Sequence, residues 1–65
     1  MNYKLYVCGS KIGCKTLKEF ESRNDSEAAG IAVKIITDYE NESGDYIYRE
    51  HLYCNDSEGQ REIAI

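Results

Sequence analysis

The segment with the clearest potential for chemistry is the glycine-containing stretch from Gly9 to Thr16. It nearly fits the pattern Gly-x-x-x-x-Gly-Lys-Ser/Thr, in which backbone amides surround a phosphate group. The fit fails at Cys14, which stands where the pattern requires a second glycine, because a side chain there keeps the amides from curling around phosphate. A chain of 65 residues also has no room for the parallel sheet of nucleotide-hydrolysing enzymes. The stretch is therefore interpreted as a hairpin turn with solvated lysines.

Three cysteines and one histidine are the candidate metal ligands and nucleophiles: Cys8, Cys14, Cys54 and His51. Structural zinc sites use tight Cys-x-x-Cys pairs, which this chain lacks. A Cys/His nucleophilic pair needs a third, orienting group, and none is identifiable. We expect no catalytic residue, no metal site and no cofactor. An odd number of cysteines also argues against a disulfide-stapled domain, so reduced, buried thiols are expected.

Carboxylates cluster where the predicted helix ends: Asp38, Glu40, Glu42 and Asp45. Their alternation is typical of a calcium-binding loop, but counted from Asp38 the required glycine is Ser43 and the bidentate glutamate is Arg49. A solvated acidic rim is the better interpretation. Because acids are unfavourable at a helix C-terminus, by about a few tenths of a kcal/mol each, their presence favours a role in binding.

Composition and charge narrow the class of protein. Residues 1–23 hold five basic and two acidic residues, whereas residues 24–65 hold three basic and ten acidic ones. An acidic surface repels phosphate, which disfavours nucleic-acid binding and favours a partner with a basic surface. Neither a membrane-spanning run nor a secretory start is present, so a cytoplasmic location is expected. The whole chain, 1–65, is predicted to be one small domain.

The N-terminal half predicts a hairpin. Residues 3–8 are aromatic and β-branched with rough alternation, which indicates a strand. The glycines of 9–13 supply the conformations of a turn. Residues 15–22 are ambiguous between helix and strand, and their place after a hairpin turn favours strand, with Phe20 facing inward.

A helix is predicted next. Asn24 is a good N-cap and Glu27 stands three residues on, in capping-box position. Apolar residues then recur at spacings of three and four through about four turns: Ala28, Ile31, Ala32, Ile35, Ile36 and Tyr39. Gly44 can take the left-handed conformation that ends a helix.

Two more strands, 45–54 and 60–65, are predicted on either side of a loop at 55–59. The fold class is therefore α+β: a four-stranded, largely antiparallel sheet in the order β-β-α-β-β with one helix on one face. Alternation places Tyr46, Tyr48, Leu52 and Cys54 on one side of 45–54, and Ile47, Arg49, His51 and Tyr53 on the other. A bulge near Glu50 would mix these sets, since ten residues is long for an unbent strand.

In layout the chain resembles the small acidic inhibitors of phages and mobile elements, anti-CRISPR proteins among them, over Tyr3–Val7, Asn24–Tyr39 and Tyr46–Tyr53. The resemblance implies a non-catalytic protein that occupies a basic, nucleic-acid-binding surface of a larger protein, in the host cytoplasm if the gene is a phage gene. Because tyrosine offers a large contact area with a polar tip, exposed tyrosines are expected to take part. The predicted partner-binding residues are Asp38, Glu40, Glu42, Asp45, Tyr46 and Tyr48.

Two other hypotheses stay open. In the first, the sheet binds single-stranded nucleic acid, with tyrosines stacking on bases and lysines following the phosphates: Lys4, Lys11, Lys15 and Lys18. In the second, the C-terminal strand, residues 61–65, presents an open edge through which the chain associates with itself.

Overall fold

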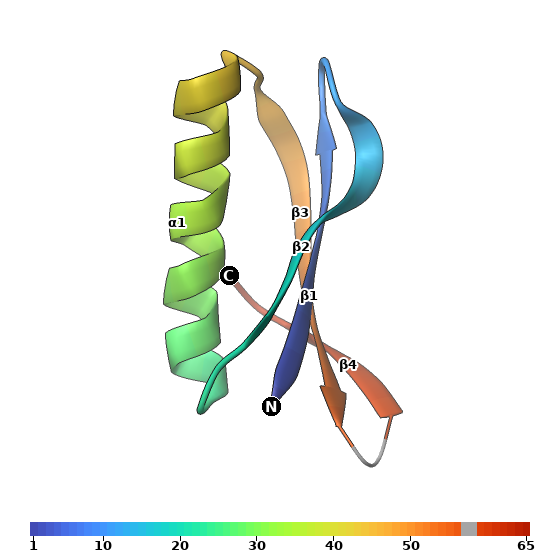
Figure 1. The fold of residues 1–65 in the computed structure, drawn as a ribbon. Coiled ribbons are helices and arrows are strands. Elements are labelled where there is room, and N and C mark those ends of the chain that lie inside the picture. The colour runs from blue at the N-terminus through green and yellow to red at the C-terminus, as the bar shows by residue number, and fades with distance from the viewer. Residues whose placement is uncertain (57–58) are drawn as a thin grey trace.

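One helix packs against one four-stranded antiparallel sheet in the computed structural model, which describes residues 1–56 and 59–65 (Figure 1). The elements follow one another along the chain as β1 (Asn2–Gly9), β2 (Gly13–Glu21), α1 (Asp25–Ser43), β3 (Ile47–Asp56) and β4 (Gly59–Ile63). The spatial order is β2-β1-β3-β4, so pairing of β1 with β3 joins two hairpins. The predicted α+β class and β-β-α-β-β order are confirmed.

The structure decides between strand and helix for residues 15–22 and sets the bounds of the loop between β3 and β4. Residues 15–22 fall almost wholly in β2, so the choice of strand over helix was right. The predicted loop at 55–59 is shorter than expected, because Asp56 still belongs to β3 and Gly59 already belongs to β4. Ser57 and Glu58, which complete that predicted loop, lie outside the described residues.

Both predicted ends of α1 are confirmed. The Asn24 side chain accepts a hydrogen bond from the Glu27 backbone amide at 2.8 Å, which satisfies one of the free donors of the first turn. Glu27 in turn accepts from the Ser22 hydroxyl at 2.9 Å. At the other end Gly44 adopts φ 71°, and its amide donates to the Glu40 carbonyl at 2.9 Å. A residue with a Cβ would be strained there.

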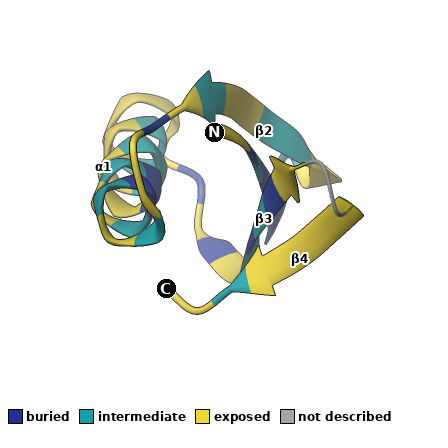
Figure 2. Cartoon of the chain, turned by 90° about the horizontal axis from the view of Figure 1, so that it is seen from below, coloured by how far each residue is buried: buried dark blue, intermediate teal, exposed yellow. Residues whose placement is uncertain are grey.

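The core lies between α1 and one face of the sheet. Ala28 and Ala32 of α1 are fully buried, and because alanine is small the helix can lie close to the strands. Figure 2 shows the buried parts of the helix and of the central strands on the side where the two layers meet. The sheet residues of this core are Tyr3, Leu5, Val7, Ile47, Leu52 and Cys54.

A shift of register changes which side chains of β3 reach the core. Cys8 pairs with Arg49 but Gly9 pairs with Ile47, so Tyr48 is the extra residue of a bulge. The bulge was predicted near Glu50 and lies two residues earlier. It corrects the predicted faces, because Ile47 joins Leu52 on the helix side of the sheet instead of lying opposite to it.

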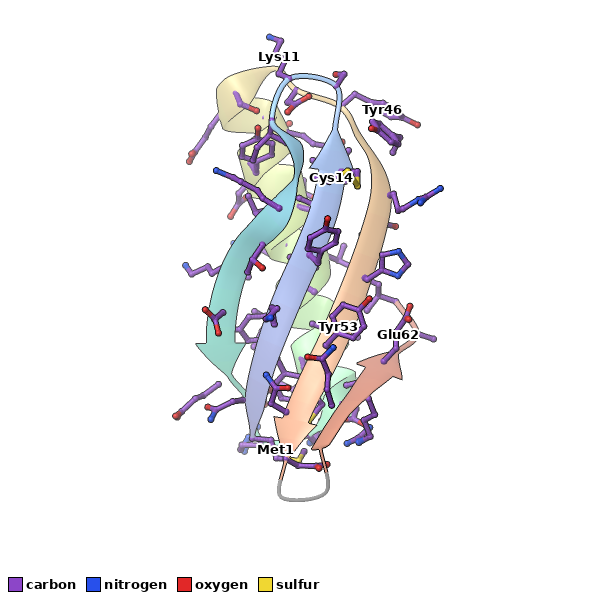
Figure 3. All side chains as sticks on the ribbon, turned by 90° about the vertical axis from the view of Figure 1, so that its right-hand side faces the viewer. Met1, Lys11, Cys14, Tyr46, Tyr53 and Glu62 are labelled. Carbon is purple, nitrogen blue, oxygen red and sulfur yellow. A yellow bond between two sulfur atoms is a disulfide. The ribbon has the colours of Figure 1, made fainter. Side chains whose placement is uncertain are left out.

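The opposite face of the sheet has no helix over it, and we name it the uncovered face. Figure 3 looks onto this face, with Tyr53, Glu62 and Cys14 turned toward the viewer. Direct cross-strand partners share a face, so the register identifies its other members: Lys4, Tyr6, Cys8, Thr16, Glu19, Arg49 and His51.

Cys8 and Cys14 form a disulfide on the uncovered face, which corrects the expectation of reduced thiols. The two residues are direct partners in the β1–β2 hairpin, with their Cα atoms 4.0 Å apart. Counting cysteines missed the pair because only the hairpin register brings them together. Cys54 is free and buried, as expected. The prediction of reduced thiols is therefore wrong for Cys8 and Cys14 and confirmed for Cys54.

Within the described residues, no helix combines the length and the apolar character needed to cross a bilayer.

Candidate functional site

The carboxylate of Asp45 is the anchor of the end of the molecule where α1 passes into β3. Asp45 is buried, at 5% exposure. Its Oδ1 accepts from the Ser10 hydroxyl at 2.9 Å, the Lys11 amide at 2.9 Å and the Tyr46 amide at 2.7 Å. Its Oδ2 accepts from the Ile12 amide at 3.0 Å and the Tyr39 hydroxyl at 2.8 Å. One side chain thus ties the β1–β2 turn to the helix and to the start of β3.

The turn at 9–13 therefore does surround an anion, but that anion belongs to the chain itself. Two consecutive amides and a hydroxyl converge on the Asp45 carboxylate, much as the glycine pattern would converge on a phosphate. Gly9 is needed for this approach, because a Cβ at that position would lie 2.9 Å from the Asp45 Oδ2 atom.

These contacts set the ionisation of Asp45. Burial alone would raise the pKa of the carboxyl, but the hydrogen bonds from Lys11, Tyr39, Ser10 and Tyr46 outweigh burial and hold the pKa well below its ordinary value. The hydrogen bond that the Tyr39 hydroxyl donates to Asp45, together with burial, raises the pKa of Tyr39. Asp45 is therefore charged at neutral pH, with its charge fully used inside the fold.

Two further carboxylates have lowered pKa values at the other end of the helix. Hydrogen bonds from Arg61 and from Tyr3 lower the pKa of Asp25, and hydrogen bonds from Arg23 and Ser22 lower that of Glu27. The Asp25 carboxylate receives the Tyr3 hydroxyl at 2.8 Å and Arg61 Nη1 at 2.8 Å. Asp25 thereby links α1 to β1 and β4.

The lowered pKa values of Asp25, Glu27 and Asp45 predict acid sensitivity. An unfolded chain takes up protons on these groups near pH 4, while the folded chain does not until lower pH. Stability is therefore fully present above about pH 5 and falls as the pH drops through 4 toward the folded pKa values. Urea unfolding followed at pH 6 and at pH 3 is expected to show a clearly lower midpoint at pH 3. Equal midpoints would contradict the assigned hydrogen bonds.

Glu40 also serves the fold. Its Oε2 atom accepts the Ile47 amide at 2.9 Å, which fixes the first residue of β3 to the last turns of α1. Of the four carboxylates predicted to bind a partner, Asp45 is buried and Glu40 is engaged with the backbone. This corrects the picture of four free acids. Only Asp38 and Glu42 remain exposed, and Asp38 lies 3.8 Å from Lys34.

Tyr46 and Tyr48 are the predicted site residues with the largest exposed apolar surface. Tyr46 is 66% exposed and Tyr48 57% exposed, both above Val33 at 53%. Tyr46 stands at the end of the molecule where the helix passes into β3, as Figure 3 shows. We name Asp38, Glu42, Tyr46 and Tyr48 the helix-exit corner. The structure brings the ends of α1 and β3 that carry these residues to the same end of the molecule (Figure 1).

The four lysines of the nucleic-acid hypothesis do not form one track. Lys15 pairs with Val7 and Lys18 with Leu5, both buried under the helix, so these lysines fall on the helix side of β2. Lys4 lies on the uncovered face, where its direct partner is Glu19. Lys11 donates to the Ser43 carbonyl at 3.4 Å. The pleat of the sheet thus separates Lys15 and Lys18 from the tyrosines of the uncovered face, whereas Lys4 shares that face with its direct partner Tyr53.

Two hollows in the surface lie away from the glycine turn. One of about 320 Å³ is lined by Asn2, Phe20 and Asn55 among others, and one of about 420 Å³ by Met1 and Arg23 among others. Neither is lined by Lys15 or Thr16. In the part of the chain that the structure describes, no group of three His, Cys, Asp or Glu side chains is placed to hold a metal ion.

Sequence reasoning missed the anchoring role of Asp45. The sequence shows Asp45 directly after the helix-ending Gly44, but only the folded chain brings its carboxylate to the amides of Lys11 and Ile12. It missed the bridge from Asp25 to Arg61 as well, because these residues are 36 positions apart and meet only in the folded chain.

Comparison of the chain with protein-family models, with curated proteins and with solved structures finds no match. The function must therefore be argued from the geometry of the chain.

Proposed function

We propose that this chain is a non-catalytic protein-binding module that contacts a larger protein through the helix-exit corner. The observation that carries the proposal is the exposure of two neighbouring aromatic side chains, Tyr46 at 66% and Tyr48 at 57%. Tyrosines are enriched among the residues that supply most of the binding energy at protein interfaces. Such an exposed pair at the start of β3 is well placed to anchor a partner.

The backbone that presents the tyrosines is held in place before any partner arrives. The Tyr46 amide donates to Asp45 at 2.7 Å, and the Tyr46 carbonyl accepts the Ser10 amide at 3.0 Å. The Ile47 amide is fixed by Glu40. Because the segment is already ordered, binding costs less conformational entropy than it would for a loose loop.

The acidic side of the proposal rests on Asp38 and Glu42. Both are exposed in the last two turns of α1, where the helix C-terminus adds its own negative partial charge. Such charges attract a basic surface and raise the association rate. An inhibitor that covers a basic, nucleic-acid-binding surface fits this combination, with two exposed carboxylates at the corner in place of the four first predicted.

A pull-down tests the proposal. The tagged chain serves as bait in a lysate of the organism that encodes it, beside the double variant Tyr46→Ala/Tyr48→Ala and the control Val33→Ala. We expect the double variant to retain roughly a tenth or less of the partner, because a tyrosine that acts as a hot spot costs about 2 kcal/mol or more when it is truncated. Val33 is exposed on α1 and is expected to be neutral.

Equal capture by the double variant and by the control would overturn the role of the tyrosines. The acidic part is tested separately with Asp38→Asn/Glu42→Asn. If this variant captures the same partner at low salt and with an unchanged association rate, the acidic charges are not needed for binding. Binding through the tyrosines would then remain as the proposal.

A further inference from the structure

The outer edge of β3 is only half covered. β3 runs from Ile47 to Asp56, but β4 pairs with Leu52–Asp56 alone. Before Leu52, β3 has β1 on one side and, within the described residues, no strand on the other. Figure 3 shows this edge running free from the tip of β4 to the start of β3.

The start of this edge is engaged, and the rest is open. The Ile47 amide donates to Glu40, so the open stretch is 48–51, which we name the free edge. Its first three residues are exposed and His51 is half-buried. In an antiparallel sheet every second residue turns its N–H and C=O groups outward, so the free edge offers hydrogen bonds to an extended chain.

A second copy of this chain is a poor occupant. When the β3 edges of two copies pair antiparallel, residues directly opposite one another lie on the same face of the joined sheet. The two-fold axis must then pass through one residue, which pairs with the same residue of the other copy. The registers that use most of the free edge centre on Arg49 or on Glu50, which places either side chain against its own copy. Like charges directly opposite one another destabilise a strand pair. The edge is therefore better suited to a different chain.

Charge on the neighbouring strand indicates what the free edge would accept. His51 and Arg49 both lie on the uncovered face, and Glu62 of β4 meets His51 Nδ1 at 2.9 Å. Arg49 is exposed and forms no ion pair with the residues that the structure describes. Glu50, its neighbour, points to the other face of the sheet. An added strand in line with β4 would complement these two charges if it carried an acid opposite Arg49 and a base opposite Glu50.

We propose that the free edge binds an extended segment of a protein partner as an added antiparallel strand in line with β4, with a carboxylate of that segment beside Arg49. This inference rests on the proposed function, since Tyr48 belongs to both surfaces. Strand addition gains affinity from backbone hydrogen bonds and specificity from alternate side chains. The base opposite Glu50 is consistent with a partner of basic surface.

The probe is a displayed library of random heptapeptides, selected against the immobilised wild-type chain. We expect the selected peptides to be rich in β-branched residues, with an acid and a base at adjacent fixed positions. Against Arg49→Glu their affinity is expected to fall roughly tenfold, because an attractive cross-strand pair becomes repulsive. Replacing the acid of the peptide with lysine is expected to restore binding to Arg49→Glu.

Lys18→Glu is the matched control, because it makes the same change of charge at an exposed residue of the opposite edge strand, β2. The inference is overturned if Arg49→Glu and Lys18→Glu lower the affinity of the selected peptides equally. It is also overturned if the selected peptides lack the acid, or if the library yields no binder. One result separates the two proposals: the tyrosine double variant loses the lysate partner, whereas Arg49→Glu keeps that partner and binds the peptides as tightly as wild type does. In that case the proposed function stands and the strand-addition inference fails.

Discussion

Replacing Asp45 with alanine is expected to lower the melting temperature on the order of 15 °C. The carboxylate accepts hydrogen bonds from Ser10, Lys11, Ile12, Tyr39 and Tyr46. Its removal leaves these five part-buried donors without that acceptor, and each carries part of a desolvation penalty. In a domain of this size the melting temperature moves by several degrees for every kcal/mol. Thermal unfolding followed by circular dichroism measures the effect.

Two comparisons make the result specific. Asp45→Asn keeps one acceptor oxygen but loses the charge, and is expected to fall between alanine and wild type. Asp38→Ala removes an exposed carboxylate and is expected to stay within a few degrees of wild type. Since the turn would then offer free amides, sodium formate is expected to stabilise Asp45→Ala more than wild type. A melting temperature for Asp45→Ala equal to that of Asp38→Ala would contradict the anchoring role.

Replacing Leu52 with alanine is expected to destabilise the fold by about 2–5 kcal/mol. Leu52 is fully buried, and its direct partners are Leu5 of β1 and Ile63 of β4. Truncation loses the transfer free energy of the side chain and leaves a cavity where the two hairpins meet under the helix. Since a domain of this length has roughly 3 to 10 kcal/mol in total, the variant approaches the limit of folding. Urea unfolding measures the change.

The exposed Val33 is the control for Leu52, because Val33→Ala removes apolar atoms that are already half in water. Its effect is expected to stay within about 0.5 kcal/mol. Equal unfolding midpoints for the two variants would mean that Leu52 does not lie in the core as described.

Local signals in the sequence predicted most of the fold. The Asn24 cap, the apolar spacing of the helix and the Gly44 terminus each act within a few residues, so the bounds of α1 could be read from the sequence. The glycine pair at positions 9 and 13 likewise predicted the first hairpin. The position of the bulge was missed, because it is set by how β3 pairs with β1, which lies almost forty positions earlier in the chain.

The candidate site was harder to predict for the same reason. In the sequence, Glu40 and Asp45 look like members of a solvated acidic rim. Only the fold brings Ser10–Ile12 to Asp45 and Ile47 to Glu40, where the two carboxylates accept hydrogen bonds from the chain itself. The disulfide between Cys8 and Cys14 likewise needs the hairpin register. Tyr46 and Tyr48 are exposed, in agreement with the expectation that some tyrosines face solvent.

The central claim is that a partner protein covers the helix-exit corner. It is tested most directly by adding the captured partner to the isotope-labelled chain and recording which backbone amides change in the nuclear magnetic resonance spectrum. We predict changes at Tyr46, Tyr48 and Glu42, with Lys15 and Lys18 on the far strand unaffected. Changes confined to Lys15, Lys18 and their neighbours in β2, with Tyr46 and Tyr48 unmoved, would contradict the account.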